Sequence, residues 1–165
     1  MTTSGNESLP RPNLARPLHL LAFGFGSGLS PKAPGTMGTL VGMLIYLPLS
    51  HLPFWWYLDV TVAAIVAGIG ICGWSSRQLG VHDHPGIVWD EIAGYLVTML
   101  WAPPGLPWML AGFALFRLFD ILKPWPIGWF DRRVQGGFGI MLDDVLAGLA
   151  AMVCIQLVSR FVLPA

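Results

Sequence analysis

Long apolar segments dominate this sequence and limit what the chain can fold into. Four of them are long enough to cross or nearly cross a lipid bilayer, at residues 36–52, 57–76, 106–122 and 140–162. A helix needs about 20 residues to span a hydrocarbon core ~30 Å thick. Only 11% of the residues are charged, whereas soluble domains usually carry about 25%. We therefore expect an all-α integral membrane protein.

Two shorter apolar segments complete the predicted fold. Segment 88–102 would cover only about 22 Å as a helix at ~1.5 Å per residue, so we expect it to extend into its flanks or to end within protein. Segment 18–29, "LHLLAFGFGSGL", is too short and too rich in glycine to span. The expected fold is a bundle of about five membrane helices plus a short re-entrant or interfacial N-terminal helix. Residues 1–12 are polar and are predicted to form a disordered cytoplasmic tail before a single membrane domain, 13–165.

Basic residues predict how the bundle is oriented. When the segments are threaded through a bilayer in turn, most Lys and Arg residues fall on the side that holds residues 30–35, and Arg160 alone falls on the other. Cytoplasmic loops carry the Lys/Arg excess of membrane proteins, so we expect this side to face the cytoplasm. Its basic residues are Arg11, Arg16, Lys32, Arg77, Arg117, Lys123, Arg132 and Arg133.

Acidic residues gather at the same predicted membrane face. Ionisable groups at membrane depth are costly and mark functional sites by default. Crowded carboxylates repel one another, and a divalent cation would offset this repulsion. Oxygen ligands without Cys or His favour Mg²⁺ over Zn²⁺. We therefore predict a Mg²⁺ site whose catalytic and metal-binding residues are Asp90, Glu91, Asp120, Asp143 and Asp144.

Cations suited to an anionic substrate lie beside these acids. The run "FRLFDILKPWP" places Arg117, Asp120 and Lys123 at three-residue intervals, which share one face of a helix. The glycine-rich loop around Lys32 precedes Thr36, a plausible N-cap, and a helix N-terminus binds anions. We predict that the substrate is bound by Lys32, Thr36, Arg117 and Lys123. In a second interpretation, Asp120 merely pairs with its basic neighbours, which anchor the helix at the interface.

The remaining polar residues allow two interpretations. His82 and His84 are candidates for proton transfer because His titrates near neutrality, but their loop could only cap a helix. Asp131, Arg132 and Arg133 lie in the amphipathic stretch "KPWPIGWFDRRVQGG" and are interpreted as interface anchors. The acids at helix starts could likewise serve only to complement helix dipoles.

Small residues follow two of the acids at helical spacing. Gly94 lies four residues after Asp90, and Gly148 lies four residues after Asp144. Small residues let helices approach closely in membranes. We therefore expect these two segments to pack tightly and to bring their carboxylates together.

Three blocks of the sequence resemble a known family: "FGFGSGLSPKAPGTMGTL", "VHDHPGIVWDEIAG" and "FRLFDILKPWPIGWFDRRVQGGFGIMLDDVLAG". They are similar to phosphatidylglycerophosphatase A. The resemblance implies a Mg²⁺-dependent integral membrane phosphatase of bacterial phospholipid synthesis. Such an enzyme converts phosphatidylglycerophosphate to phosphatidylglycerol, here in the cytoplasmic (inner) membrane with its site facing the cytoplasm. The resemblance also implies that the five predicted acids occupy the family's acidic motif positions.

Other functional classes fit the sequence less well. An ion- or proton-coupled transporter is the main alternative, but transporter sites lie near the membrane midplane between repeats. Here the acids lie at helix ends and no repeat is visible. A structural membrane subunit would show no turnover. The formal net charge of zero gives no reason to expect a nucleic-acid partner.

Overall fold

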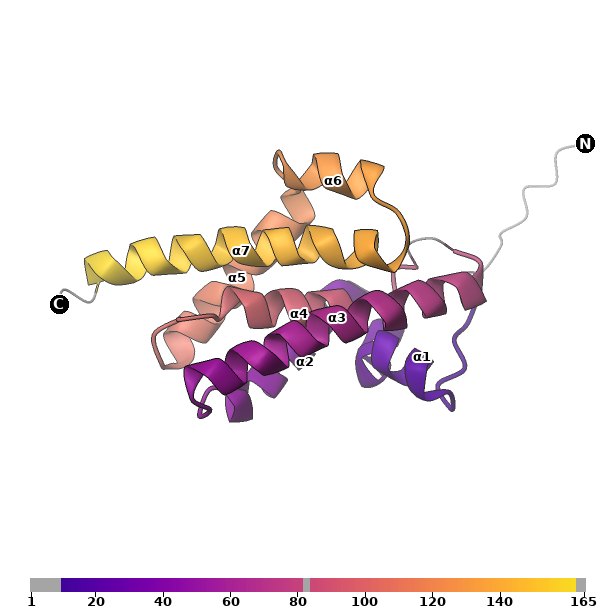
Figure 1. Ribbon diagram of the computed structural model, residues 1–165, viewed down its shortest axis with the longest axis horizontal. Helices are drawn as coiled ribbons and strands as arrows, with labels where there is room; N and C mark the ends of the chain where they lie inside the picture. Colours follow the sequence, from indigo (N-terminus) through magenta and orange to yellow (C-terminus); the bar gives the residue numbers. More distant parts are fainter. Residues whose placement is uncertain (1–9, 82–83, 163–165) are drawn as a thin grey trace, which may run out of the picture.

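Every regular element in the described part of the chain is a helix. The computed structural model describes residues 10–81 and 84–162 (Figure 1). The predicted all-α class is thus confirmed for these residues, whereas the tail of residues 1–12 falls mostly outside them and the domain division stays a prediction. The elements are α1 (Pro17–Ala22), the 3₁₀ helix η1 (Gly24–Leu29), α2 (Pro34–Leu49), α3 (Phe54–Leu79), α4 (Trp89–Thr98), α5 (Leu106–Leu122), α6 (Ile127–Arg133) and α7 (Gly136–Val162).

Helix α7 holds the bundle together. It packs against α3, α4, α5 and α6. Figure 1 shows that α3 and α7 run in opposite directions along the long axis, with α4 beside them. The end of α3 therefore lies at the same end of the molecule as the beginnings of α4 and α7. This arrangement places the acids at the start of α4 close to the first half of α7, which carries Asp143 and Asp144.

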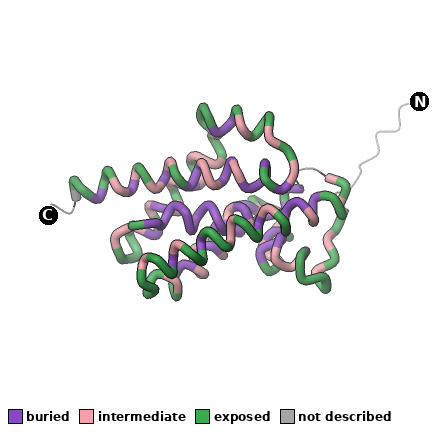
Figure 2. Tube along the Cα trace, in the orientation of Figure 1, coloured by how far each residue is buried: buried purple, intermediate pink, exposed green. Residues whose placement is uncertain are grey.

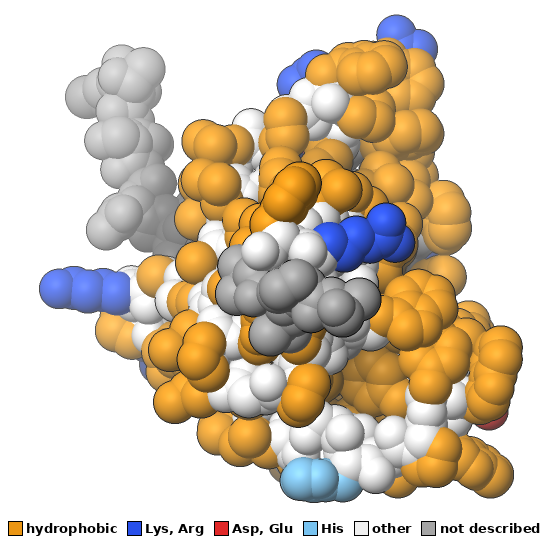
Figure 3. Space-filling model, turned by 90° about the vertical axis from the view of Figure 1, so that its left-hand side faces the viewer, with side chains coloured by type: hydrophobic (Ala, Val, Ile, Leu, Met, Phe, Trp, Pro, Cys, Tyr) orange, Lys and Arg blue, Asp and Glu red, His pale blue; other side chains and the backbone are white. Residues whose placement is uncertain are grey.

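Two helices, α3 and α7, are long and apolar enough to cross a membrane. They coincide with the predicted segments 57–76 and 140–162, and the 26 residues of α3 give a length of about 39 Å. Helices α2 and α5 occupy two further predicted segments, but they have only 16 and 17 residues. Figure 3 shows one end of the molecule covered mostly by hydrophobic side chains, with almost no carboxylate in view. The total of about five membrane helices stays a prediction.

Helix α4 is surrounded by protein. It has ten residues, and all of those from Ile92 to Thr98 are buried (Figure 2). The Tyr57 hydroxyl of α3 donates a hydrogen bond of 2.6 Å to the carbonyl of Leu96, which lies near the end of α4. Such bonds satisfy carbonyl groups that a helix end leaves without partners. Of the two expectations for segment 88–102, the structure supports an end within protein.

The N-terminal apolar stretch folds into two short helices before α2. Residues 18–29 form most of α1 and all of η1, with Phe25 in the left-handed region at φ 59°. Whether this piece is re-entrant or interfacial stays a prediction. The expectation that Thr36 caps the next helix was wrong, because α2 begins at Pro34 with Ala33 as its N-cap. Proline favours the first helical position since its φ is already helical.

Helices α4 and α7 meet through backbone, as their glycines predict. A Cβ placed on Gly94 would lie 2.8 Å from the carbonyl oxygen of Asp144, and one on Gly148 would overlap the carbonyl oxygen of Gly94. No side chain therefore fits between the helices at either position. The close packing predicted from the sequence is confirmed.

We predict that Gly148→Val lowers the free energy of unfolding by about 1–3 kcal/mol, because a side chain there forces α4 away from α7. Thermal unfolding in detergent would measure this change. Gly70→Ala is the control, because an added Cβ there meets no atom within 4 Å apart from its chain neighbours and the backbone of its own helix. Alanine there should stabilise α3 by about 0.5–1 kcal/mol. Equal unfolding temperatures for Gly148→Val and wild type would contradict the packing argument.

Candidate active site

A cavity of about 420 Å³ lies where the acid-bearing parts of several helices meet. Its wall combines the start of α2, the start of α4, the end of α5 and the first half of α7, so residues far apart in sequence face one space. All five predicted acids line it, together with both predicted cations of the α5 region. The charged lining residues are Asp90, Glu91, Arg117, Asp120, Lys123, Asp131, Asp143 and Asp144.

Three of these carboxylates are close enough to share a metal ion. Asp90, Glu91 and Asp144 each offer an oxygen, and these three oxygens lie within 4.8 Å of one another. Asp90 and Asp144 are only 8% and 3% exposed. Oε2 of Glu91 and Oδ2 of Asp144 are buried without a hydrogen-bond partner among the described residues. Because a buried, unsatisfied carboxylate oxygen is costly, this group of acids fits a bound cation.

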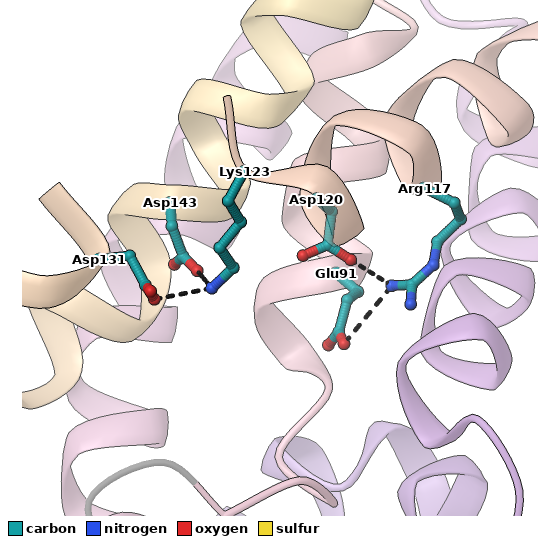
Figure 4. A network of polar contacts seen from close by, with 6 residues as sticks. All are labelled: Glu91, Arg117, Asp120, Lys123, Asp131 and Asp143. Atoms are coloured by element: carbon teal, nitrogen blue, oxygen red, sulfur yellow. Dashed lines mark hydrogen bonds and ion pairs between the residues drawn. The ribbon is translucent and has the colours of Figure 1, made fainter. Parts of the chain in front are cut away.

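Arg117 partly balances the acids on the α5 side of the cavity (Figure 4). Its Nη1 lies 2.5 Å from Oδ2 of Asp120 and 3.7 Å from Oε1 of Glu91. The first turn of α2 packs directly on this group. A Cβ on Gly35 would overlap the Glu91 carboxylate and lie 3.0 Å from Nη1 of Arg117. Glycine at this position therefore lets α2 close one side of the cavity.

Lys123 forms a second ion-pair group on the α7 side (Figure 4). Its Nζ donates hydrogen bonds of 2.7 Å to Asp131 and 2.5 Å to Asp143. Burial acts to lower the pKa of Lys123, but the hydrogen bonds and charges of these two carboxylates outweigh it and raise the pKa above its usual value. Lys123 is therefore a fixed cation that links the end of α5 to α6 and α7.

Lys123 does not lie on the helix face that the sequence predicted for it. The residue does not extend the stripe of Arg117 and Asp120 along α5, because the helix ends at Leu122 and Lys123 takes a left-handed conformation, φ 41°. Asp131, interpreted above as an interface anchor, lines the cavity instead. A clue was available in the sequence, since Asp131 is one of few acids and falls on the same predicted membrane side as the others.

Several other predicted residues lie outside the acidic cavity. Lys32 is exposed, and Thr36 does not line the wall, although the residues between them do. His84 lines a neighbouring cavity, where its Nδ1 accepts a hydrogen bond from the Gly86 amide and its Nε2 lies 3.1 Å from the Pro10 carbonyl oxygen. This geometry gives no support to proton transfer by His84. His82 lies outside the described residues.

The sequence model of the phosphatidylglycerophosphatase A family matches residues 20–159. The chain belongs to this family. Phosphatidylglycerophosphatase A of Escherichia coli (strain K12) is 47% identical over 140 residues, covering 84% of this chain and 81% of the relative. The protein of the same name from Haemophilus influenzae is 45% identical over 161 residues, covering 96% and 98%. No solved structure matches the chain significantly. The resemblance and the assignment as a phosphatase are confirmed.

We predict that Lys123→Gln lowers the free energy of unfolding by about 1–3 kcal/mol, because two carboxylates lose a charged hydrogen-bond partner. Lys123 has a raised pKa, so its contribution is present below the ordinary lysine pKa and lost only as pH rises through the folded value. The loss should therefore persist across neutral pH in denaturation experiments. Exposed Lys32→Gln is the control and should change stability by less than about 0.5 kcal/mol. An equal effect of both variants would contradict a bridging role for Lys123.

Proposed function

We propose that the enzyme hydrolyses the terminal phosphomonoester of phosphatidylglycerophosphate, giving phosphatidylglycerol and phosphate in bacterial phospholipid biosynthesis. The observation that carries this proposal is the cavity in which three clustered carboxylates lie beside two fixed cations. Such a site suits a phosphate accompanied by a metal ion. The relatives are named for this activity, and the chain covers most of their length.

The donor set fits Mg²⁺, which prefers carboxylate and phosphate oxygens. Asp90, Glu91 and Asp144 would hold the ion, since each offers an oxygen to a common point. In addition, Oε2 of Glu91 and Oδ2 of Asp144 are buried without a hydrogen-bond partner among the described residues. When bound, Mg²⁺ would supply Lewis-acid polarisation of the phosphate and a water of lowered pKa. Metal binding by Asp120 and Asp143 stays a prediction, and both carboxylates have cationic partners in any case.

The two cations would position the phosphate and stabilise its developing charge. Lys123 has three N–H donors, and Asp131 and Asp143 engage two of them. Among the described residues no other group accepts the third N–H, which could donate to a phosphate oxygen. Arg117 approaches its carboxylates through Nη1, and a guanidinium has five N–H donors in all. Because both cations are already held by carboxylates, they need to move little when the substrate binds.

We favour water as the nucleophile, with attack opposite the bond to the lipid glycerol. The phosphorus–oxygen bond to glycerol breaks, the glycerol oxygen takes a proton, and phosphatidylglycerol leaves. Attack by an aspartate with a covalent intermediate is the alternative. Both routes need the same buried carboxylates and cations, so the proposed substrate does not depend on which is used.

A bacterial cytoplasmic membrane, with the cavity opening to the cytoplasm, is the proposed location. Helices α3 and α7 suit a membrane, and the cavity lies at the end where both helices meet the predicted cytoplasmic side. A transporter is not favoured, because the relatives that cover most of this chain are named as phosphatases.

The decisive experiment is phosphate release from phosphatidylglycerophosphate by purified protein in detergent. We expect release with Mg²⁺ and its loss after chelation. Asp144→Asn should lower kcat/KM at least about 100-fold, because it removes a carboxylate from the cluster. Asp59→Asn is the control, since this exposed residue lies on α3 outside the cavity. Wild-type protein that releases no phosphate would contradict the proposed function.

Metal binding can be measured without turnover by titrating Mn²⁺, an oxygen-binding substitute with a magnetic resonance signal. We expect Asp144→Asn and Glu91→Gln each to weaken Mn²⁺ binding by about 10–100-fold. Asp59→Asn should bind as wild type does. If all four proteins bound Mn²⁺ equally, the three-carboxylate metal site would be wrong.

A further inference from the structure

Helix α5 carries an exposed apolar stripe along its whole length. Its large exposed members recur at helical spacing, and exposed Ala114 fills the gap between the second and the third. The stripe faces away from the bundle, because buried Met109, Gly112 and Phe116 occupy the opposite side of α5. The large members of the stripe are Leu106, Leu110, Leu118, Ile121 and Leu122.

The stripe ends at the acidic cavity. Three isoleucines line that cavity, and two of them, Ile87 and Ile140, are only 3% and 5% exposed. Ile121 lines the same cavity but is 67% exposed. Its side chain therefore belongs both to the cavity wall and to the outer surface of α5. The apolar face of α3 lacks this continuity, because no residue of α3 lines the cavity.

The dimensions of the stripe suit a lipid chain. The 17 residues of α5 extend about 26 Å, more than half of a hydrocarbon core ~30 Å thick. At the cavity end, the apolar surface gives way to Arg117 and Lys123, which match an anionic head group. A phospholipid with its phosphate in the cavity could thus place an acyl chain along α5, where the chain contacts apolar surface throughout.

We propose that the phospholipid substrate enters the cavity sideways past Ile121, with an acyl chain resting on the α5 stripe. This inference rests on the proposed function and adds a specificity determinant to it. Ile121 is a positioning residue that contacts the part of the lipid next to the head group. It makes long-chain lipids better substrates than short-chain ones, because only a long chain covers the stripe while its phosphate is in the cavity.

The test compares kcat/KM for dioleoyl and dihexanoyl phosphatidylglycerophosphate in mixed micelles. We expect Ile121→Asn to lower the ratio of the long-chain to the short-chain value by about ten-fold, since a polar group interrupts the apolar path. Ile121→Ala keeps the surface apolar and should lower the ratio less. Val66→Asn on α3 is the matched control, because Val66 is 64% exposed but does not line the cavity. Its ratio should equal that of wild type.

Two results would overturn the inference alone: an unchanged ratio in Ile121→Asn, even if both values fell together, or an equal change in Val66→Asn. Wild-type protein that releases phosphate from neither lipid would overturn the proposed function, and this inference with it. The two failures are therefore distinguishable in one set of measurements.

Discussion

The close approach of α4 and α7 is the contact on which the candidate site depends. Gly94 and Gly148 leave only backbone between the two helices. As a result, Asp90 and Glu91 at the start of α4 face Asp144 of α7 closely enough for their oxygens to share one ion. A side chain at either glycine would push α4 away from α7 and would thereby separate the carboxylates. Helix packing and proposed metal binding thus rest on the same pair of small residues.

Two ion-pair groups make this crowding of acids tolerable. Arg117 balances Asp120 and Glu91 on one side of the cavity, and Lys123 balances Asp131 and Asp143 on the other. Six carboxyl groups of the described residues nevertheless line the cavity with only these two cations, so the acids outnumber their basic partners. This lining suits the metal-assisted phosphate chemistry proposed above.

The sequence predicted most of the architecture because its strongest signals are local. Apolar length located α2, α3, α5 and α7, and glycine spacing predicted the contact of α4 with α7. Threading predicted that the acids converge, since antiparallel spans place alternate ends on one side. What it could not predict was set by tertiary structure or by backbone details at helix ends. The left-handed turn at Lys123 and the start of α2 at Pro34 belong to this group. The burial of α4 was one of two outcomes that the sequence left open.

The burial of α4 has a consequence for biogenesis. Its ten residues span only about 15 Å, too short to insert into a bilayer as an independent unit. The helix is buried only because α2, α3, α5 and α7 pack around it. In a newly made chain that has not yet assembled these partners, the adjacent acids Asp90 and Glu91 of α4 would lie apart from Asp143 and Asp144 of α7. The three-carboxylate cluster therefore forms only once α4 and α7 have packed together.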